Sequence, residues 1–486
     1  MMSDRKDRLI VLVLFLIVSS LYFWTAAGIT STNEGSHYAL IRAMGDEGRF
    51  EISTYIDYTG YNDYSAYEGR FYSDRPPGTA LLALPFYFFS RILPTPPAPA
   101  SVSIVDDNPA VVTLLMLPAI AGGLVAAMLY LLLRDAEIGR PAPVIAALAY
   151  AFGSLIFKYG GVLYSHAVSS LCVLAGIFFT LKAVRRGGVT PGLGLILGFS
   201  LGYSVLAEYN NAIFMVLALF YLAIRLKNRL FTGKCAKLSL LAMFVGGMLP
   251  IGFLLFYNAT NFGSPFSTSY TYVQTYEWAR SFATTFDFPL WDGLKGQLWS
   301  GWDTSKQELQ VQGIFLLMPV TLLAIPGLWE YGKKRGKEAL LTLGIFLVYL
   351  VLMAKHRTFG GYTGDTRYLT SFLALLFLPV GFVLERVFTM KECLQKTALT
   401  FIAFSLIFLS VRNMLLHIGY SFNYHLDLCL VHRQAGLPED WLYMAGNIFV
   451  NGWNLPMLWL LEGIIGALIA GGIWLRNRRA PQSPAV

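Results

Sequence analysis

Apolar residues in this sequence gather in blocks of about 20 residues, and short polar stretches separate these blocks. A helix of about 20 residues rises 1.5 Å per residue and so crosses the ~30 Å hydrocarbon core of a bilayer. We expect spans at 9–29, 109–133, 141–157, 162–183, 191–207, 211–226, 237–258, 311–330, 338–354, 368–389, 397–416 and 455–476. The pattern predicts an all-α polytopic membrane protein with about twelve transmembrane helices, in which residues 1–486 form a single membrane-embedded unit.

Three long polar segments interrupt the apolar blocks, at 30–108, 259–310 and 417–454. Within the first, the residues from Tyr38 to Glu47 mix apolar and charged side chains, as in an amphipathic helix lying at the membrane surface. The apolar stretch 76–93 contains three prolines, so we expect a second interfacial or re-entrant helix there.

The charge distribution sets the expected orientation. Only 14% of residues are charged, against about 25% in soluble domains. Most of the 37 Lys and Arg residues lie in short segments between apolar blocks, and the alternation of these segments follows the positive-inside rule. We therefore expect a multi-pass protein of the cell (plasma or inner) membrane, with both termini cytoplasmic and the long loops outside. Topology also accounts for the net charge of +8, so nucleic acid is not an expected partner.

The first candidate site residue is Glu34, which directly follows the first span and precedes His37 and Tyr38. A carboxylate at the membrane–water boundary could serve as a catalytic base. The alternative is a structural cap at a helix N-terminus, which the helix dipole favours.

A second candidate region is Tyr72-Ser73-Asp74-Arg75, which follows a predicted hairpin around Gly69 and precedes Pro76-Pro77. Asp74 and Arg75 could form a surface ion pair with each other. Alternatively, Arg75 is held there for an anionic headgroup.

Ionisable residues at other predicted outer ends complete the set. His166 lies one turn inside a span and is either a functional group or a hydrogen-bonded core histidine. Lys355, Arg357 and Arg367 are basic residues on an otherwise acidic face, next to Tyr368 in a glycine-rich stretch. A bound phosphate would explain them, whereas pairing of Arg367 with Asp365 is the structural alternative.

Three segments resemble the GT-C superfamily of integral membrane glycosyltransferases, which includes protein O-mannosyltransferases and aminoarabinose transferases. They are the run 72–87 around Asp-Arg-Pro-Pro-Gly, the run 257–265 with Tyr-Asn and Phe-Gly-Ser-Pro, and Thr-Arg-Tyr-Leu at 366–369. The resemblance implies that Glu34 is the first-loop acidic residue acting as a base. It also implies that Arg75 and Arg367 bind the donor phosphate, with Lys355 and Arg357 nearby.

Further site assignments accompany this resemblance. Asp74 has no counterpart in the superfamily and is a second candidate catalytic carboxylate. His37, Tyr38, Tyr72 and Tyr368 are candidate substrate-binding residues. If a divalent metal ion takes part, Glu34 and His166 are its candidate ligands, and no nucleotide cofactor is expected.

The activity implied is transfer of a monosaccharide from a polyprenyl-phosphate donor to an acceptor hydroxyl on the outer face, with inversion at the anomeric carbon. The acceptor could be a glycan, a lipid or a protein, and membrane lipid is an expected partner. The alternatives are a lipid-linked sugar flippase or transporter, and an oligosaccharide polymerase or ligase.

Overall fold

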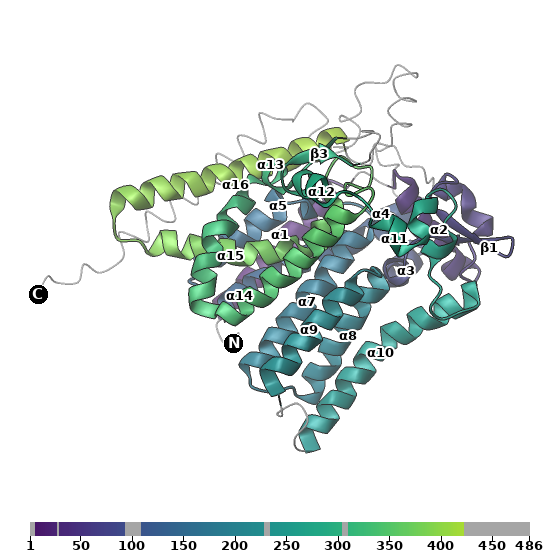
Figure 1. Ribbon diagram of the computed structural model, residues 1–486, viewed down its shortest axis with the longest axis horizontal. Helices are drawn as coiled ribbons and strands as arrows, with labels where there is room; N and C mark the ends of the chain where they lie inside the picture. The colour runs from purple at the N-terminus through teal and green to yellow at the C-terminus, as the bar shows by residue number, and fades with distance from the viewer. Residues whose placement is uncertain (1–4, 27–28, 93–107, 228–233, 304–309, 422–486) are drawn as a thin grey trace, which may run out of the picture.

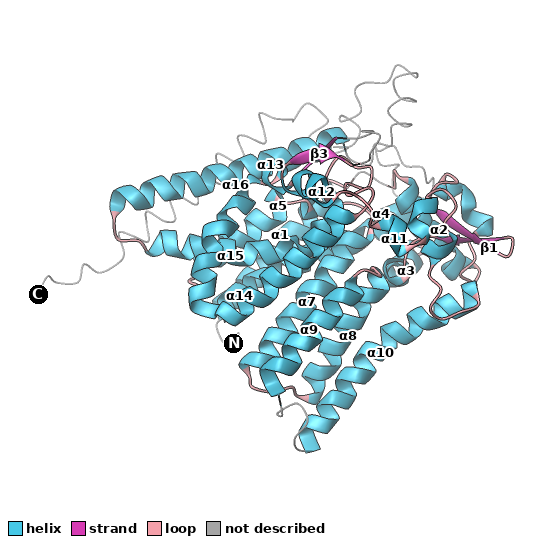
Figure 2. Ribbon diagram, viewed as in Figure 1, coloured by secondary structure: helices cyan, strands magenta, loops and turns pink. Residues whose placement is uncertain are grey.

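The structure is a computed structural model and describes residues 5–26, 29–92, 108–227, 234–303 and 310–421. Helices dominate this part of the chain (Figure 2). The long and apolar ones are α1 (Arg5–Trp24), α4 (Asn108–Asp135), α5 (Pro141–Gly153), α7 (Ser165–Arg185), α8 (Pro191–Ala207), α9 (Asn211–Leu226), α10 (Lys234–Phe262), α14 (Ala324–Lys355), α15 (Leu373–Thr389) and α16 (Cys393–Ser421).

These helices coincide with the predicted apolar blocks wherever the blocks fall in the described residues. Six segments of the described chain are long and apolar enough to cross a membrane, and shorter apolar helices accompany them. A multi-pass and predominantly helical membrane protein is therefore confirmed. The total of about twelve spans stays a prediction, because the span expected at 455–476 and most of the segment 417–454 lie outside the described residues.

The helix α14 is a helical hairpin. Arg335 has non-helical backbone angles (φ −142°, ψ 48°), and these break α14 into two helices. The chain leaves α12 (Leu290–Leu298) beside Gly313 and returns to it at Ala354, so the two halves run in opposite directions. This agrees with the span predicted at 338–354, whereas the segment predicted as a span at 311–330 belongs to α14 only from Ala324.

Short elements connect these helices, and many of them gather at one end of the bundle (Figure 1). They are α2 (Thr32–Asp46), η1 (Ser53–Thr59), β1 (Tyr64–Tyr67), β2 (Arg70–Ser73), α3 (Gly78–Ser90), α6 (Ile156–Tyr159), η3 (Ser269–Tyr272), η4 (Glu277–Arg280), α11 (Phe282–Thr285), α12, β3 (Ser300–Trp302), β4 (Gln310–Gln312), α13 (Ile314–Leu317), η5 (Pro319–Leu323) and η6 (Arg367–Phe372). The predicted hairpin is present, because β1 and β2 pair around Glu68 and Gly69, which both have positive φ.

Helix α2 departs from the expectation of an interfacial amphipathic helix. Most of its residues are buried, including every one from Asn33 to Ile41. Other outer elements, among them η1, β2 and α3, pack against it. Because these elements cover α2, the helix belongs to the core. A local sequence pattern does not reveal such packing.

The segments predicted to be cytoplasmic lie together at the opposite end. Asp7 pairs with Arg134 and Arg140 at 3.2 and 3.0 Å, and Arg185 pairs with Asp135 and Glu338 at 2.6 and 2.5 Å. The alternation of loops between two ends is thus confirmed. That this end faces the cytoplasm stays a prediction.

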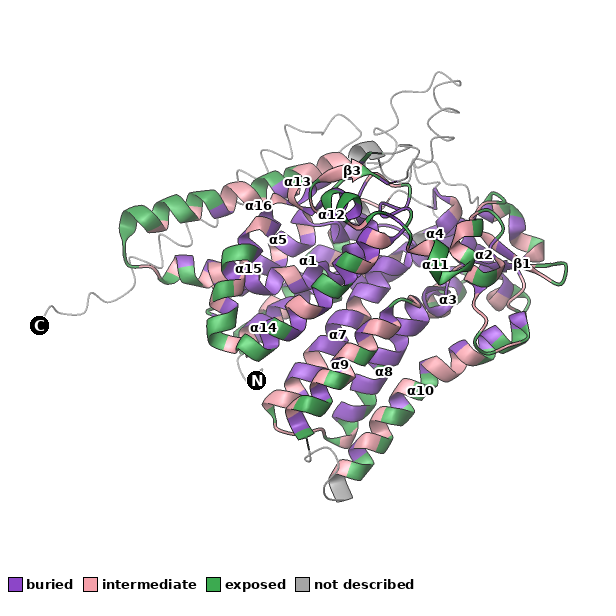
Figure 3. Ribbon diagram, viewed as in Figure 1, coloured by how far each residue is buried: buried purple, intermediate pink, exposed green. Residues whose placement is uncertain are grey.

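Helices α8 and α10 pack closely against each other through glycines of α8. Gly194, Gly198 and Gly202 line α8 where a side chain would collide with the α10 backbone at Ser239, Met243 and Gly247. Small residues at this spacing allow helices to approach closely inside a membrane. Much of the remaining surface of α10 is exposed, as on α16 (Figure 3). Helix α10 is therefore attached mainly through this glycine face.

We expect Gly198→Ala to destabilise the protein, because its methyl group would meet the Met243 carbonyl oxygen. Alanine is otherwise favoured over glycine in a helix by about 1 kcal/mol, whereas overpacking costs about 1–3 kcal/mol. Thermal unfolding in detergent should show a melting temperature lower by about 2–6 °C.

The matched control is Gly192→Ala on the same helix, where a methyl group meets nothing within 4 Å. It should leave the melting temperature unchanged or raise it. Equal melting temperatures for both variants would contradict the close contact between α8 and α10.

Candidate functional site

Glu34 is fully buried and caps its own helix. Its Oε2 accepts hydrogen bonds from Thr30 N at 2.9 Å and from Ser31 N and Oγ at 3.1 Å each. Its Oε1 accepts from Leu163 N at 3.0 Å, so the side chain also ties α2 to the turn before α7. Burial raises the pKa of Glu34 to about 7. Because this carboxylate caps α2 and holds the turn before α7, the geometry favours the capping alternative over a role as base.

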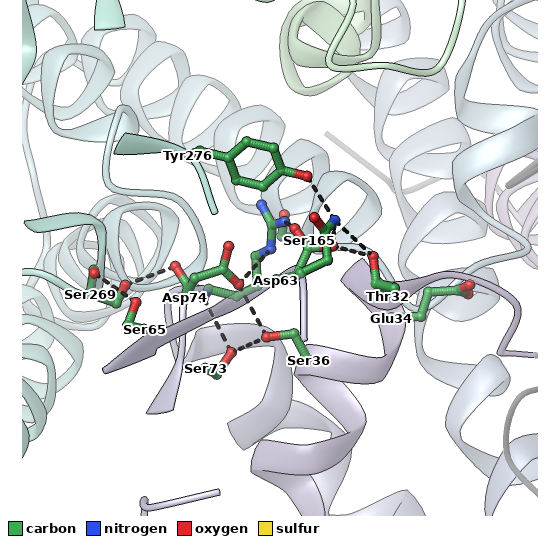
Figure 4. Close-up of polar contacts among 12 residues, drawn as sticks. Thr32, Glu34, Ser36, Asp63, Ser65, Ser73, Asp74, Ser165, Ser269 and Tyr276 are labelled. Carbon is green, nitrogen blue, oxygen red and sulfur yellow. Dashed lines mark hydrogen bonds and ion pairs between the residues drawn. The ribbon is translucent and has the colours of Figure 1, made fainter. Parts of the chain in front are cut away.

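Arg75 lies between two buried carboxylates, those of Asp63 and Asp74, which Figure 4 labels. It pairs with Asp63, and its Nε lies 3.2 Å from Asp74 Oδ1. Thr32 of α2 donates to Asp63, and Ser36 donates to Asp74 at 3.1 Å. The alternative of an Asp74–Arg75 pair is thus confirmed, although the pair is buried, not on the surface. Burial raises the pKa of Asp74 to about 7.

His37 is a polar side chain without a protein partner beside this unit. Its side chain is fully buried, and neither ring nitrogen makes a hydrogen bond within the described chain. Burial and the Arg75 charge lower the pKa of His37 to about 3, so the ring is neutral at physiological pH. Buried polar atoms are nearly always satisfied. Two unsatisfied nitrogens beside Arg75 and Asp63 are therefore a specific indication of a ligand.

Arg367 is the buried cation that no carboxylate neutralises among the described residues. It is 8% exposed, and its guanidinium lies over the rings of Tyr164 and Tyr368, at 5.5 and 5.1 Å from their centroids. Its Nε has no hydrogen-bond partner. Gly361 packs directly against the guanidinium in a positive-φ conformation that leaves room for it. An anion is the partner that this arrangement lacks.

Asp365 does not pair with Arg367, contrary to the structural alternative. Its carboxylate binds Lys158 Nζ at 2.6 Å and lies 2.8 Å from His417 Nε2 on α16. Tyr159 and Thr363 donate further hydrogen bonds to it. Burial alone would raise the pKa of Asp365, but Lys158 and His417 hold it well below its usual range.

The two arginines face common neighbours. Arg75 and Arg367 both act electrostatically on Glu208, which accepts a hydrogen bond from Ser165. Burial raises the pKa of Glu208. Tyr368 lies within electrostatic reach of both arginines, and the same is true of His166. The predicted phosphate-binding residues Arg75 and Arg367 thus come from distant segments to one cluster.

Other candidates lie apart from this cluster. Tyr38 packs edge-on against Tyr58 at 4.9 Å, on the face of α2 next to Arg42. Tyr72 packs against Phe262 at 5.2 Å. Arg357 is exposed and lies 3.7 Å from Asp287.

Two further candidates complete the placement. Lys355 ends α14, where its carbonyl accepts from Phe288 N. His166 lies among the rings of Tyr159, Tyr164 and Tyr368, at 4.8, 5.7 and 6.5 Å between centroids.

Asp63 is the main residue that sequence reasoning missed. It follows η1 in a tyrosine-rich stretch of the first loop and is 4% exposed. No motif surrounds it. The only available signal was an acidic residue directly after a short turn, a feature that many surface loops share.

The residues present do not fit a divalent metal ion. No group of three His, Cys, Asp or Glu side chains suited to a metal occurs in the described residues. The carboxylate of Glu34 already accepts hydrogen bonds from Thr30, Ser31 and Leu163, and Asp63 and Asp74 already hold the guanidinium of Arg75. The chemistry proposed below therefore uses no metal ion.

The fold and this cluster define an integral membrane protein with a buried, charged site at one end of a helical bundle. No protein-family model matches the sequence, and no curated protein matches it either. The structure is similar to the apo oligosaccharyltransferase of Archaeoglobus fulgidus, with a TM-score of 0.54 and 14% identity over 89% of this chain and 59% of that chain. This chain thus spans less than two thirds of that enzyme.

ArnT from Cupriavidus metallidurans bound to undecaprenyl phosphate is similar too. It has a TM-score of 0.51 and 13% identity over 90% of this chain and 74% of that chain. The archaeal oligosaccharyltransferase AglB from Archaeoglobus fulgidus, in complex with an inhibitory peptide and a dolichol-phosphate, has a TM-score of 0.52 and 14% identity. That match covers 91% of this chain and 60% of the other. These neighbours are GT-C glycosyltransferases. The predicted resemblance is confirmed at the level of the fold.

The buried Glu34 carboxyl predicts a pH dependence of stability. Its folded pKa of about 7 lies above the ordinary 4.5, so the folded state keeps the proton where the unfolded state loses it. Stability should therefore fall as pH rises from 4.5 to 7, by up to about 1.4 kcal/mol per pH unit for one group. Glu34→Gln should flatten this slope when thermal unfolding is followed between pH 4.5 and 8.

The same variant should lower stability by about 1–3 kcal/mol at pH 8, because its amide nitrogen would face the Leu163 N–H. Glu277→Gln on exposed η4 is the control and should change neither quantity. A Glu34→Gln protein of unchanged stability and pH profile would contradict the capping role.

Proposed function

We propose that this protein is a glycosyltransferase that moves a monosaccharide from a polyprenyl-phosphate donor to an acceptor hydroxyl, on the outer face of the membrane and with inversion. The observation that carries the proposal is Arg367, a buried guanidinium held by aromatic rings and without a carboxylate in the described chain. A donor phosphate would supply the missing negative charge. The GT-C fold supports a lipid-linked donor, since ArnT is bound to undecaprenyl phosphate.

Arg367 is the better of the two arginines for the phosphate itself. Arg75 already has two carboxylate partners, whereas Arg367 has none within the described residues. We assign Arg75 to fixing Asp63 and Asp74 and to adding positive potential near Glu208. Lys355 and Arg357 are assigned no contact with the phosphate.

Asp63 is our candidate for the base. It lies within electrostatic reach of Tyr164, over whose ring Arg367 is placed, and it also acts on His37. Glu34 acts on Tyr164 too, but its carboxylate caps α2 and binds the turn before α7. Asp74, with its pKa of about 7, is a second candidate, and His37 would bind a hydroxyl of the substrate.

In the proposed reaction the acceptor hydroxyl oxygen attacks the anomeric carbon as the bond from that carbon to the phosphate oxygen breaks. Asp63 accepts the hydroxyl proton. The transition state has oxocarbenium character. Negative charge grows on the departing polyprenyl phosphate, and the fixed Arg367 guanidinium stabilises it without reorganisation.

A flippase or transporter would move the lipid-linked sugar across the membrane without forming a new glycosidic bond. Purified protein in liposomes with a radiolabelled polyprenyl-phosphate sugar separates the classes. The proposed enzyme should release unlabelled polyprenyl phosphate and label an acceptor from a membrane extract. A polymerase or ligase would instead require an oligosaccharide donor.

Arg367→Ala should abolish most transfer, because the leaving phosphate loses its cation. Loss of a single preorganised electrostatic group typically costs about 10²–10³-fold in rate. The measurement is release of polyprenyl phosphate from the labelled donor under single-turnover conditions. Arg70→Ala serves as the control, since Arg70 is exposed on β2 and pairs only loosely with Glu51 at 3.9 Å. If both variants turned over at the wild-type rate, the proposed function would be overturned.

Asp63→Asn should lower the rate of transfer by about 10²–10⁴-fold if Asp63 takes the proton. Donor binding should change little, because Asp74 still holds Arg75. Asp57→Asn is the matched control in the same loop, where the exposed Asp57 side chain accepts a hydrogen bond from Tyr61. Full activity of Asp63→Asn, with loss of activity in Asp74→Asn, would move the base to Asp74.

A further inference from the structure

Two oppositely charged residues, Asp365 and Arg367, lie two positions apart in one buried loop but do not pair. The loop carries three glycines, and Gly361 and Gly364 have positive φ, so its backbone could adopt other turns. Tyr159 lies within electrostatic reach of both charges. A buried carboxylate so close to a buried guanidinium would normally form an ion pair with it.

Lys158 occupies the carboxylate instead. The side chains of Lys158 and Asp365 are both fully buried, with Nζ and Oδ2 2.6 Å apart. Lys158 comes from α6, in the short connection between α5 and α7, whereas Asp365 precedes η6. The pair therefore joins two segments more than 200 residues apart, immediately beside the guanidinium proposed to meet the phosphate.

Because Asp365 is buried, it matters which cation pairs with it. A lone buried charge is costly, and whichever cation is nearest will compensate it. With Lys158 present, Asp365 is satisfied and Arg367 keeps its positive charge for a ligand. Without Lys158, Asp365 would need another cation, and Arg367 is the buried cation that lacks a carboxylate among the described residues.

We propose that Lys158 is a positioning residue that keeps Asp365 away from Arg367 and thereby preserves an anion site for a lipid phosphate. This inference rests on the proposed role of Arg367. It assigns a function to an ion pair that would otherwise be regarded as a structural link between α6 and the glycine-rich loop. Neither Lys158 nor Asp365 touches the substrate in this scheme.

The three relevant variants have distinct expected effects on phosphate binding. Lys158→Met should weaken binding at least tenfold, because Asp365 then competes for Arg367. Asp365→Asn should bind as tightly as the wild type or more tightly, because the competing carboxylate is gone. The double variant Lys158→Met/Asp365→Asn should recover binding to within about threefold of the wild type. If the ion pair were only a structural link, Asp365→Asn and the double variant would both bind phosphate more weakly than the wild type, because each breaks the same connection.

The probe is farnesyl phosphate, titrated into the full-length protein in detergent and followed by intrinsic tryptophan fluorescence at pH 8. At this pH an ordinary histidine is neutral, so His417 would not replace Lys158 as the cation. Farnesol, which lacks the phosphate, measures binding by the lipid chain alone. Lys334→Met is the control, because Lys334 pairs with Glu385 at the other end of the bundle.

Thermal unfolding of each variant separates folding from binding. If Lys158→Met does not fold, Asp365→Asn still decides the matter: weaker binding by a folded Asp365→Asn protein overturns the proposal. So does wild-type affinity in Lys158→Met, or a double variant that stays as weak as Lys158→Met. The proposed function fails separately, if Arg367→Ala binds farnesyl phosphate as well as the wild type.

Discussion

Compensation of buried charge is the constraint on which the described structure of this site depends. Several ionisable side chains are withdrawn from water at one end of an apolar bundle, where an unpaired charge is expensive. Each of these carboxylates has hydrogen-bond donors or a cation beside it: Glu34 accepts from Thr30, Ser31 and Leu163, Asp63 and Asp74 share Arg75, and Asp365 has Lys158. The exception among the described cations is Arg367. A buried cation without a counter-charge, such as Arg367, indicates a binding site for an anion. A purely structural network would pair all of its charges.

The same contacts hold the outer elements on the bundle. Glu34 joins α2 to the turn before α7, and the Lys158–Asp365 pair joins α6 to the loop before η6. His417 extends that pair to α16, a helix with little other burial. The glycine face between α8 and α10 needs no polar group, because backbone contact alone keeps those helices together. Ion pairs and side-chain hydrogen bonds are thus concentrated at the ends of the apolar helices, and the residues of the site take part in them.

Local patterns carried the prediction of the site only part of the way. Arg75 and Arg367 stood out because basic residues are unexpected among the acidic loops, and they do reach one cluster. Glu34 stood out for its position after the first span, but that position equally suits a capping residue, and the structure shows a capping box. Asp63 carried no signal, since its importance comes from contacts with Thr32 and Arg75 across the first loop.

The sequence by itself determined the helical membrane class and the alternation of loops between two ends, because these follow from the length of apolar blocks and from charge in short loops. Only the tertiary structure decided which charges are partners. Ion pairs such as Lys158 with Asp365 form between segments far apart in the chain. Whether Arg367 meets its near neighbour Asp365 or remains available to an anion depends on that distant lysine, and no local pattern encodes the choice.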